Sequence, residues 1–184
     1  MERDLDERFS DKTVNELIKG SFEMGKAKTG ALIVIEKNTR LTEYIRTGIE
    51  LDSLVTSQLL LNIFEHNTPL HDGAIIVRGN RIISATCYLP LSDNMELSKE
   101  LGTRHRAGVG ISEVTDSLTI IVSEETGKVS IAQKGTLMRG VTPEELREQL
   151  VILQDKNTST KKFRFWKGKA GMRDYRQSER HTDQ

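Results

Sequence analysis

The 184-residue chain has one cysteine, no long apolar run and no excess of either charge. A single cysteine, Cys87, excludes an intramolecular disulfide and a zinc site built from several cysteines. The longest apolar runs, such as ALIVI at 31–35, are far shorter than the roughly 20 residues that span a bilayer. No signal-peptide pattern opens the chain. We therefore expect an intracellular soluble protein in which Cys87 is a small buried residue.

The net charge is zero because two regions of opposite sign cancel. Residues 161–184 carry eight Lys or Arg against three Asp or Glu, so the rest of the chain is acidic. Such a basic end can contact nucleic acid or an anionic membrane, or it can be a disordered terminus, which is the commoner outcome. Aromatic residues among the cations of 161–169 could stack on single-stranded bases. That segment is short and terminal, so we expect no nucleic-acid partner.

Apolar periodicity and turn residues predict helices interleaved with strands. A first helix is predicted to begin at a cap on Asp11, and a second to begin at Asp52 or Ser53 and end near Asn67. Two more helices are predicted over residues 95–101 and 142–153. The predicted strands cover residues 30–37, 74–77, 81–89, 117–122 and 128–133, the last four as two hairpins. No repeat of 20 to 50 residues occurs. The pattern indicates an α/β fold: a single domain with a central mixed β-sheet flanked by helices. We divide the chain into a charged lead-in (1–11), one domain (12–155) and a basic, disordered tail (156–184).

The segment LHDGAIIVRGNR, residues 70–81, places His71 and Asp72 directly ahead of an apolar strand. Asp-Gly is ordinary turn chemistry, so these residues alone favour a tight turn. The alternative is that a carboxylate and an imidazole at the entrance of a strand belong to a catalytic site.

Two further polar clusters carry chemistry. The segment LGTRHRAGVGISE (101–113) combines guanidinium groups with a helix start, which suits phosphate binding, although a solvated basic turn is the alternative. The segment VSEETG (122–127) ends a strand with two carboxylates and is by itself a polar hairpin turn. Together the three clusters offer carboxylates for a divalent metal, arginines for phosphates and apolar strands for a base. The chain has no Walker A pattern and no GxGxxG. The residues therefore indicate nucleotide phosphate chemistry with a metal.

The motifs DGA (72–74) and GTRHRA (102–107) resemble the two signature motifs of the diadenylate cyclase domain family. The flanking PLHDGA, LGTRHRA and VSEETG resemble most the membrane-associated CdaA-type (DacA) cyclases of Firmicutes, and the resemblance covers roughly residues 12–155. That family condenses two ATP molecules into cyclic di-AMP and two pyrophosphates. The resemblance implies a metal-dependent nucleotidyltransferase with the diadenylate cyclase fold, acting across a face-to-face homodimer. The junction at Asp72 is then catalytic, with the turn as its scaffold.

Two features depart from the family pattern. Gly108 stands where a second alanine usually follows Ala107, which weakens a helix by up to about 1 kcal/mol. CdaA-type proteins also carry transmembrane helices ahead of the cyclase domain, and this sequence contains none. We expect a cytoplasmic catalytic domain excised from a membrane-anchored parent. The family further implies a YbbR-domain regulator and phosphoglucosamine mutase as partners.

The chemistry of these clusters and the family resemblance together give a set of expected site residues. The expected catalytic residues are Asp72, Gly73, Ala74, Arg104, His105 and Arg106. The expected ATP-binding residues are Leu32, Asp72, Gly73, Tyr88, Leu89, Gly102, Thr103, Arg104, Arg106, Ser123 and Glu124. The expected metal ligands are His71, Asp72 and Glu124, for Mn²⁺ or Mg²⁺, with Co²⁺ as a third candidate. His105 either orients its segment or contacts phosphate, and Leu32 and Leu89 either enclose the adenine or pack in the core. A nucleotide sensor with a degenerate site is the rival function, against which the intact carboxylates and arginines argue.

Overall fold

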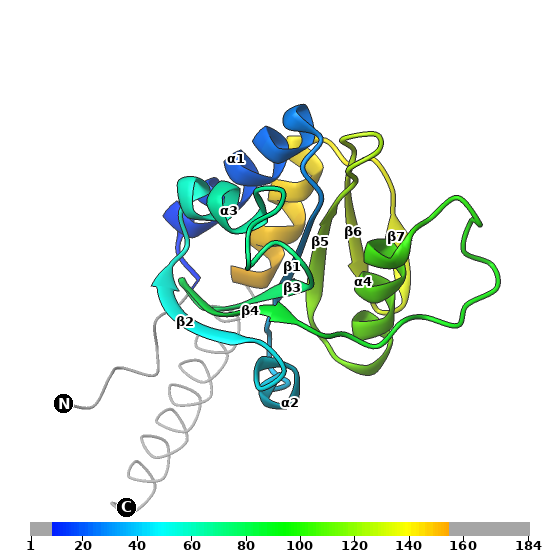
Figure 1. Ribbon diagram of the computed structural model, residues 1–184, viewed down its shortest axis with the longest axis horizontal. Coiled ribbons are helices and arrows are strands. Elements are labelled where there is room, and N and C mark those ends of the chain that lie inside the picture. Colours follow the sequence, from blue (N-terminus) through cyan, green and yellow to red (C-terminus); the bar gives the residue numbers. More distant parts are fainter. Residues whose placement is uncertain (1–8, 155–184) are drawn as a thin grey trace, which may run out of the picture.

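One seven-stranded sheet forms the centre of the computed structural model, which describes residues 9–154 (Figure 1). The sheet order is β2-β4-β3-β1-β5-β6-β7. In chain order the strands are β1 (Ala31–Ile35), β2 (Ile49–Leu54), β3 (Ala74–Arg78), β4 (Arg81–Cys87), β5 (Leu118–Val122), β6 (Val129–Gln133) and β7 (Thr136–Met138). β1 and β3 are parallel, and the other neighbouring pairs are antiparallel. The predicted mixed sheet is confirmed.

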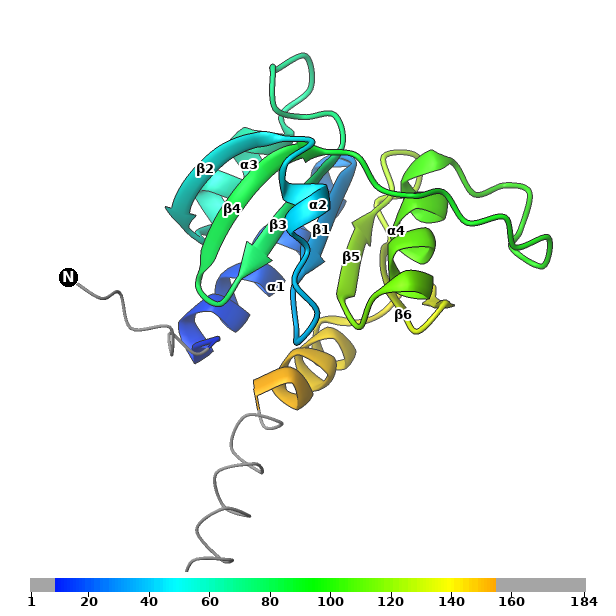
Figure 2. The same ribbon diagram turned by 90° about the horizontal axis from the view of Figure 1, so that it is seen from below.

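Helices cover both faces of this sheet (Figure 2). They are α1 (Asp11–Ala27), α2 (Thr42–Ile45), α3 (Ser57–Phe64), α4 (Thr103–Val114) and a helix over residues 143–154. The strand period of two divides β1 between two cores. Ile33 and Ile35 pack with α1, α3 and the helix 143–154, whereas Leu32 and Val34 pack with α4. Burial on both faces explains why β1, β3 and β5 are almost wholly apolar.

The N-cap of the first helix lies one residue earlier than predicted. Ser10, not Asp11, is the N-cap, and its Oγ accepts a hydrogen bond from the Thr13 N–H at 3.2 Å. Asn80, in the β3–β4 turn, accepts from the Ser10 N–H at 2.9 Å and from Thr13 Oγ1 at 2.6 Å. The start of α1 is thereby fixed to the hairpin. The buried face of the helix includes Val14, Leu17, Ile18 and Ser21.

The helix predicted from Asp52 or Ser53 is present, but its predicted start is wrong. Residues 49–54 form the edge strand β2, and α3 begins at Ser57 behind an N-cap on Thr56. Asp52 has a positive φ of 60°, and its carboxylate accepts from Arg81 Nε on β4 at 2.7 Å. Asp52 and Arg81 are 29 residues apart in the sequence, so helical periodicity cannot reveal this cross-strand contact.

The helix predicted over residues 95–101 is also absent, because the segment forms turns. Asn94 Oδ1 accepts from the Glu96 N–H at 2.9 Å, and Ser98 Oγ accepts from the Glu100 N–H at 3.3 Å. Such local side-chain bonds compete with helix formation. β4 ends at Cys87, so residues 88–102 form a long loop that projects from the body of the molecule (Figure 1).

The helix predicted over residues 142–153 is confirmed over 143–154, and it begins with a capping box. Thr142 Oγ1 accepts from the Glu145 N–H at 3.1 Å, and the Glu145 carboxylate accepts from the Thr142 N–H at 3.3 Å. Both hairpins are confirmed, and Cys87 is buried as predicted. The lead-in up to residue 8 and the predicted tail lie outside the described residues.

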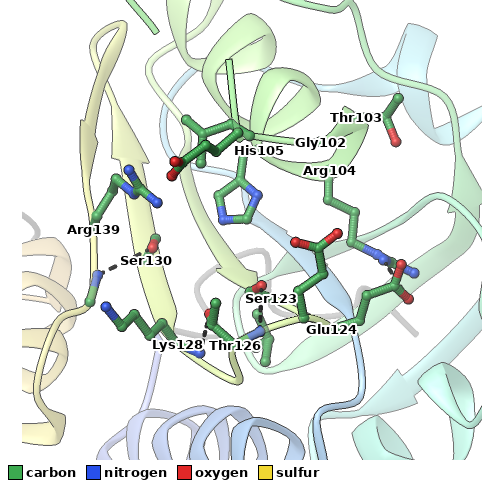
Figure 3. A pocket seen from close by; sticks show the side chains of 15 residues that line it. Gly102, Thr103, Arg104, His105, Ser123, Glu124, Thr126, Lys128, Ser130 and Arg139 are labelled. Carbon is green, nitrogen blue, oxygen red and sulfur yellow. Dashed lines mark hydrogen bonds and ion pairs between the residues drawn. The ribbon is translucent and has the colours of Figure 1, made fainter. Parts of the chain in front are cut away.

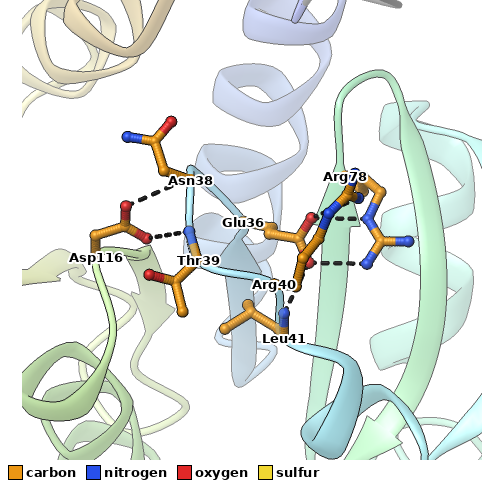
Figure 4. A network of polar contacts seen from close by, with 7 residues as sticks. All are labelled: Glu36, Asn38, Thr39, Arg40, Leu41, Arg78 and Asp116. Carbon is orange, nitrogen blue, oxygen red and sulfur yellow. Dashed lines mark hydrogen bonds and ion pairs between the residues drawn. The ribbon is translucent and has the colours of Figure 1, made fainter. Parts of the chain in front are cut away.

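A polar network closes one end of the sheet, where β1 and β3 finish (Figure 4). Glu36, whose side chain is 3% exposed, accepts from Arg78 Nε at 2.7 Å and Nη2 at 2.9 Å. It also accepts from the Leu41 N–H at 2.9 Å. Asp116 accepts from the N–H groups of Asn38 and Thr39, and these bonds hold its pKa below the ordinary aspartate value although burial opposes them. This end is filled by its own partners, which leaves the opposite end for a site.

Candidate active site

Four strands begin or finish at the end of the sheet opposite the Glu36 network. β1 and β3 begin there, and their antiparallel neighbours β5 and β4 finish there, because Ala31 pairs with Val122 and Ala74 pairs with Cys87. The edge therefore collects the residue before β1, the DGA motif before β3, the residues after β4 and the cluster after β5. Neighbouring strands lie about 4.8 Å apart, so β3 and β5, on either side of β1, are about 10 Å apart. The sequence clusters are neighbours in space because of this register.

Gly73 is required by the geometry of the DGA turn. Its φ is +79°, and a Cβ at this position would lie 2.8 Å from the Cys87 carbonyl oxygen and 2.9 Å from the Thr86 carbonyl carbon. A larger residue would therefore push β3 away from the end of β4. The close backbone approach that this glycine permits is to β4.

His71 and Asp72 lie together at the strand entrance. The His71 Nδ1 atom is 2.6 Å from the Thr68 carbonyl oxygen, which can only accept, so Nδ1 carries the proton. The Nε2 atom lies 3.2 Å from Asp72 Oδ1. A bare imidazole nitrogen and a carboxylate oxygen at that distance repel each other unless a proton or a cation lies between them. The His71 side chain is 20% exposed and the Asp72 side chain 87%, so the pair is accessible.

The GTRHRA segment forms the first turn of α4. Gly102 is the N-cap and supplies no side-chain cap, so the first N–H groups of the helix have no partner within it. Unpaired N–H groups and the helix dipole make this end suitable for an anion. The predicted helix start is present, and phosphate binding there stays a prediction.

Arg104 lies between two strand ends. Its Nη1 is 3.1 Å from Glu124 Oε2, beyond β5, and its guanidinium packs directly on Gly30, the residue before β1. A Cβ built on Gly30 would be 2.9 Å from Nε and closer still to Cζ. The absent side chain at Gly30 thus makes the space in which Arg104 lies.

A cavity of about 190 Å³ lies between α4 and the β5–β6 turn (Figure 3). It is lined by six of the predicted residues, namely Gly102, Thr103, Arg104, His105, Ser123 and Glu124. Its other polar lining residues are Glu100, Glu125, Thr126, Lys128, Ser130 and Arg139. Glu125 and Thr126 belong to the VSEETG cluster, but Lys128 and Arg139 were missed. Arg139 was missed because it directly follows β7, which was not predicted. Lys128 and Arg139, the cations at the two ends of the β6–β7 hairpin, were the available signal in the sequence.

His105 points into this cavity (Figure 3). Burial lowers its pKa below the ordinary histidine value, and the positive charges of Arg139 and Arg104 lower it further against the opposing effect of Glu125. At neutral pH the imidazole is therefore mainly uncharged, and the two cations outweigh the one carboxylate in their effect on it.

The remaining predicted residues lie outside this cavity. Leu32 is 3% exposed in the α4-side core, where Ala74 is also buried and Leu89 is partly buried, whereas Tyr88 is 76% exposed. The carbonyl oxygen of Arg106 accepts from the Ser92 N–H at 2.9 Å, which attaches the 88–102 loop to α4.

The three predicted metal ligands are not assembled as one group. His71 and Asp72 are together, whereas Glu124 is paired with Arg104. Within residues 9–154 no cluster of three or more His, Cys, Asp or Glu side chains could hold a metal ion. A metal at His71 and Asp72 therefore needs ligands from elsewhere, and phosphate oxygens and water are the usual ones for Mg²⁺.

Comparisons with known proteins agree on one family. The family model described as "DisA bacterial checkpoint controller nucleotide-binding" (DAC) matches residues 18–137. The chain is 55% identical over 166 residues to "Cyclic di-AMP synthase CdaA" of Bacillus subtilis, covering 89% of this chain and 60% of that protein. It is 52% identical over 166 residues to a "Diadenylate cyclase" of Listeria monocytogenes, covering 88% of this chain and again 60% of the relative. The chain thus spans about 60% of the length of these curated relatives.

Solved structures share the fold. A crystal structure of a double mutant of DacA from Staphylococcus aureus matches with a TM-score of 0.77 at 49% identity, covering 78% of this chain and 96% of that one. A "hypothetical membrane spanning protein" from Bacillus cereus matches with a TM-score of 0.69 at 43% identity, covering 71% and 64%. Among residues 9–154, none of the helices combines the length and the hydropathy that a membrane span requires.

Proposed function

Because the chain belongs to the diadenylate cyclase (DAC) family, we propose that it condenses two ATP molecules into cyclic di-AMP and releases two pyrophosphates. The observation that carries this proposal is the shared sheet edge. It brings the DGA turn, Arg104 and the phosphate-type helix start of α4 to neighbouring strand ends. The curated relatives named as diadenylate cyclases support the same reaction.

The phosphates of ATP are proposed to bind at the start of α4. The N–H groups after Gly102, the Thr103 hydroxyl and the Arg104 guanidinium are the donors, and Ser123 adds a hydroxyl from the end of β5. Arg106 is proposed to neutralise charge from the same turn. Leu89 and the exposed ring of Tyr88, which follow β4, are the candidates for enclosing the adenine.

His71 and Asp72 are proposed to hold the divalent metal, Mn²⁺ or Mg²⁺, or Co²⁺ as a third candidate. Two electron-pair donors, Nε2 and Oδ1, lie 3.2 Å apart and fit a shared cation. The Nδ1 bond to the Thr68 carbonyl fixes the ring for such a role. When bound, the metal lowers the pKa of a coordinated hydroxyl and neutralises phosphate charge. For Glu124 to join this ligand set, its carboxylate must leave Arg104.

The proposed step is an in-line displacement at phosphorus. The ribose 3′ oxygen of one ATP forms a bond to the α-phosphorus of the other, and the bond from that phosphorus to the β-phosphate oxygen breaks. The hydroxyl proton passes to Asp72 or to water, and pyrophosphate leaves. The same displacement in the reverse direction closes the ring. A two-fold dimer supplies both directions, because an isologous interface presents two equivalent nucleotides to each other.

The setting of the reaction in the cell is also a proposal. A protein of the CdaA type would be anchored in the membrane, with this domain on the cytoplasmic side. A YbbR-domain protein and phosphoglucosamine mutase are the regulators that the family suggests.

Product analysis tests the proposed function. The protein is incubated with ATP and Mn²⁺, or with GTP as the specificity control, and the products are separated by chromatography. We expect cyclic di-AMP and two pyrophosphates per cycle from ATP alone. Binding of ATP without any product, at concentrations that support dimers, would instead identify a nucleotide sensor.

A further inference from the structure

Two cations of the cavity, Lys128 and Arg139, have no assigned role. Lys128 directly precedes β6, and Arg139 directly follows β7. Among the described residues neither side chain makes an ion pair or a side-chain hydrogen bond. Figure 3 shows Arg139 directed toward His105, with Lys128 on the same side of the cavity.

The backbone around Arg139 is well fixed. β6 and β7 are paired, and the N–H groups that follow Arg139 continue the contact with β6. The Gly140 N–H donates to Ser130 Oγ at 3.3 Å, and the Val141 N–H donates to the Val129 carbonyl at 2.8 Å. The guanidinium therefore extends from a held strand end toward the first turn of α4.

The cavity is lined by three cations and three carboxylates, and Lys128 and Arg139 are the cations left outside an ion pair among the described residues. Glu124 is paired with Arg104, and the other lining carboxylates, Glu100 and Glu125, form no ion pair within residues 9–154. The lowered pKa of His105 follows burial first and then the positive charges of Arg139 and Arg104. Around the imidazole, the two guanidinium groups act more strongly than Glu125.

We propose that Arg139 and Lys128 bind the β- and γ-phosphates of ATP, the group that leaves as pyrophosphate. This inference rests on the proposed function and extends it. As part of this proposal the α-phosphate is assigned to Arg104, and the cavity continues from there to Arg139 on the far side of His105. A triphosphate that follows the cavity ends between the two unpaired cations.

The chemistry explains the need for these cations. When the bond from the α-phosphorus to the β-phosphate oxygen breaks, the electron pair of that bond remains on the pyrophosphate. Cations placed where charge develops stabilise the transition state more than the ground state. The Arg139 guanidinium, with two parallel N–H donors, suits two phosphate oxygens, and the Lys128 ammonium adds a point charge.

Calorimetry with ATP, AMP and pyrophosphate tests the assignment. The variants are Arg139→Gln, Arg139→Lys and Lys128→Gln, with Lys134→Gln as a matched control. Lys134 lies in the β6–β7 turn, at the opposite end of β6 from Lys128. Thermal unfolding of each variant confirms that it is folded, and Arg139→Lys replaces Arg139→Gln if the latter does not fold.

We expect Arg139→Gln to weaken ATP and pyrophosphate binding about tenfold or more, the scale of one charged hydrogen bond. Lys128→Gln should have a smaller effect of the same kind. AMP binding, which involves no terminal phosphates, should change by less than about twofold, as should every ligand with Lys134→Gln.

Several results overturn the assignment. These are equal losses for ATP and AMP, unchanged binding in both variants, a loss for pyrophosphate without a loss for ATP, and an equal loss in the Lys134 control. The proposed function is judged separately by the wild-type product. If the wild-type protein binds ATP through Arg139 but forms no cyclic di-AMP, the phosphate site stands and the proposed cyclase function is wrong. If the enzyme is active but the Arg139 variants bind ATP normally, the cyclase function stands and the phosphate site is wrong.

Discussion

Replacing Gly30 by alanine tests how the fold places Arg104. Gly30 lies outside the left-handed region of φ, so an alanine there adds no backbone strain. Its Cβ would lie 2.9 Å from Arg104 Nε and closer to Cζ, whereas ordinary contacts between such atoms are about 3.5–4.0 Å. The guanidinium must therefore move by about 1 Å, which breaks its 3.1 Å contact with Glu124 and removes it from the proposed phosphate position.

The expected cost is that of one charged hydrogen bond. Such a bond contributes about 1.5–3 kcal/mol, so we expect kcat/KM for cyclic di-AMP formation to fall about 10- to 100-fold. The free energy of unfolding should change much less, because the Arg104 side chain is partly exposed and can retreat toward solvent.

A double-mutant cycle separates this mechanism from general damage. Initial rates are measured for the wild type, Gly30→Ala, Arg104→Ala and the double variant, with thermal unfolding as the folding control. If the methyl group acts through Arg104, Gly30→Ala has almost no further effect once Arg104 is already alanine. Additive losses in the two backgrounds would refute the reasoning and show that alanine perturbs the strand end itself.

Three further predictions follow from the site and the fold. Asp72→Asn should lower cyclisation by at least about 100-fold in a rate assay, with unchanged thermal stability because the side chain is exposed; near-normal turnover would remove Asp72 from the chemistry. Thr142→Ala should lower the free energy of unfolding by about 1 kcal/mol in urea titration, without changing turnover, because it removes one half of the capping box. His105 has a pKa that is lower in the folded protein than in the unfolded chain, so the unfolded chain binds more protons and stability falls as the pH drops below the ordinary histidine value. Thermal unfolding between about pH 7.5 and 5 should show this loss in the wild type and a smaller one in His105→Gln; equal profiles would contradict it.

The parts of the fold that sequence predicts correctly are those with a local cause. The capping box of Thr142 and Glu145 is complete within four residues, and both hairpins join adjacent apolar runs. β2 was not predicted, and its last residues were assigned to the following helix, because the evidence for this strand is nonlocal: a contact from Asp52 to Arg81 and an edge position beside β4. β7, with three residues, is defined only by its pairing with β6.

The site divides in the same way. Motif residues such as Arg104 and Asp72 could be chosen from the sequence, because their types and spacing are distinctive. Arg139 and Gly30 could not, since one depends on the unpredicted β7 and the other on an absent side chain. Glu124 was placed with the metal because carboxylates bind metals, but in the structure it pairs with a guanidinium from α4. Which of two opposite charges a carboxylate meets is decided by tertiary structure.

The positions of the two motifs support the proposal that the reaction needs two protomers. The phosphate cavity lies between α4 and the β5–β6 turn, whereas Asp72 lies two strand positions away and projects into solvent. A carboxylate that activated a hydroxyl only within its own chain would gain from being enclosed, because water exclusion strengthens electrostatic effects. A carboxylate at an open face can instead meet a nucleotide presented by a second copy, and two-fold symmetry then makes the two attacks equivalent. On this view the site becomes enclosed only when two protomers pair, so specific activity should rise with protein concentration until dimers saturate.

A dilution series of initial rates at saturating ATP, run beside sedimentation of the same samples, tests the dependence of specific activity on dimer formation. Constant specific activity where only monomers sediment would show that the open face of Asp72 needs no partner.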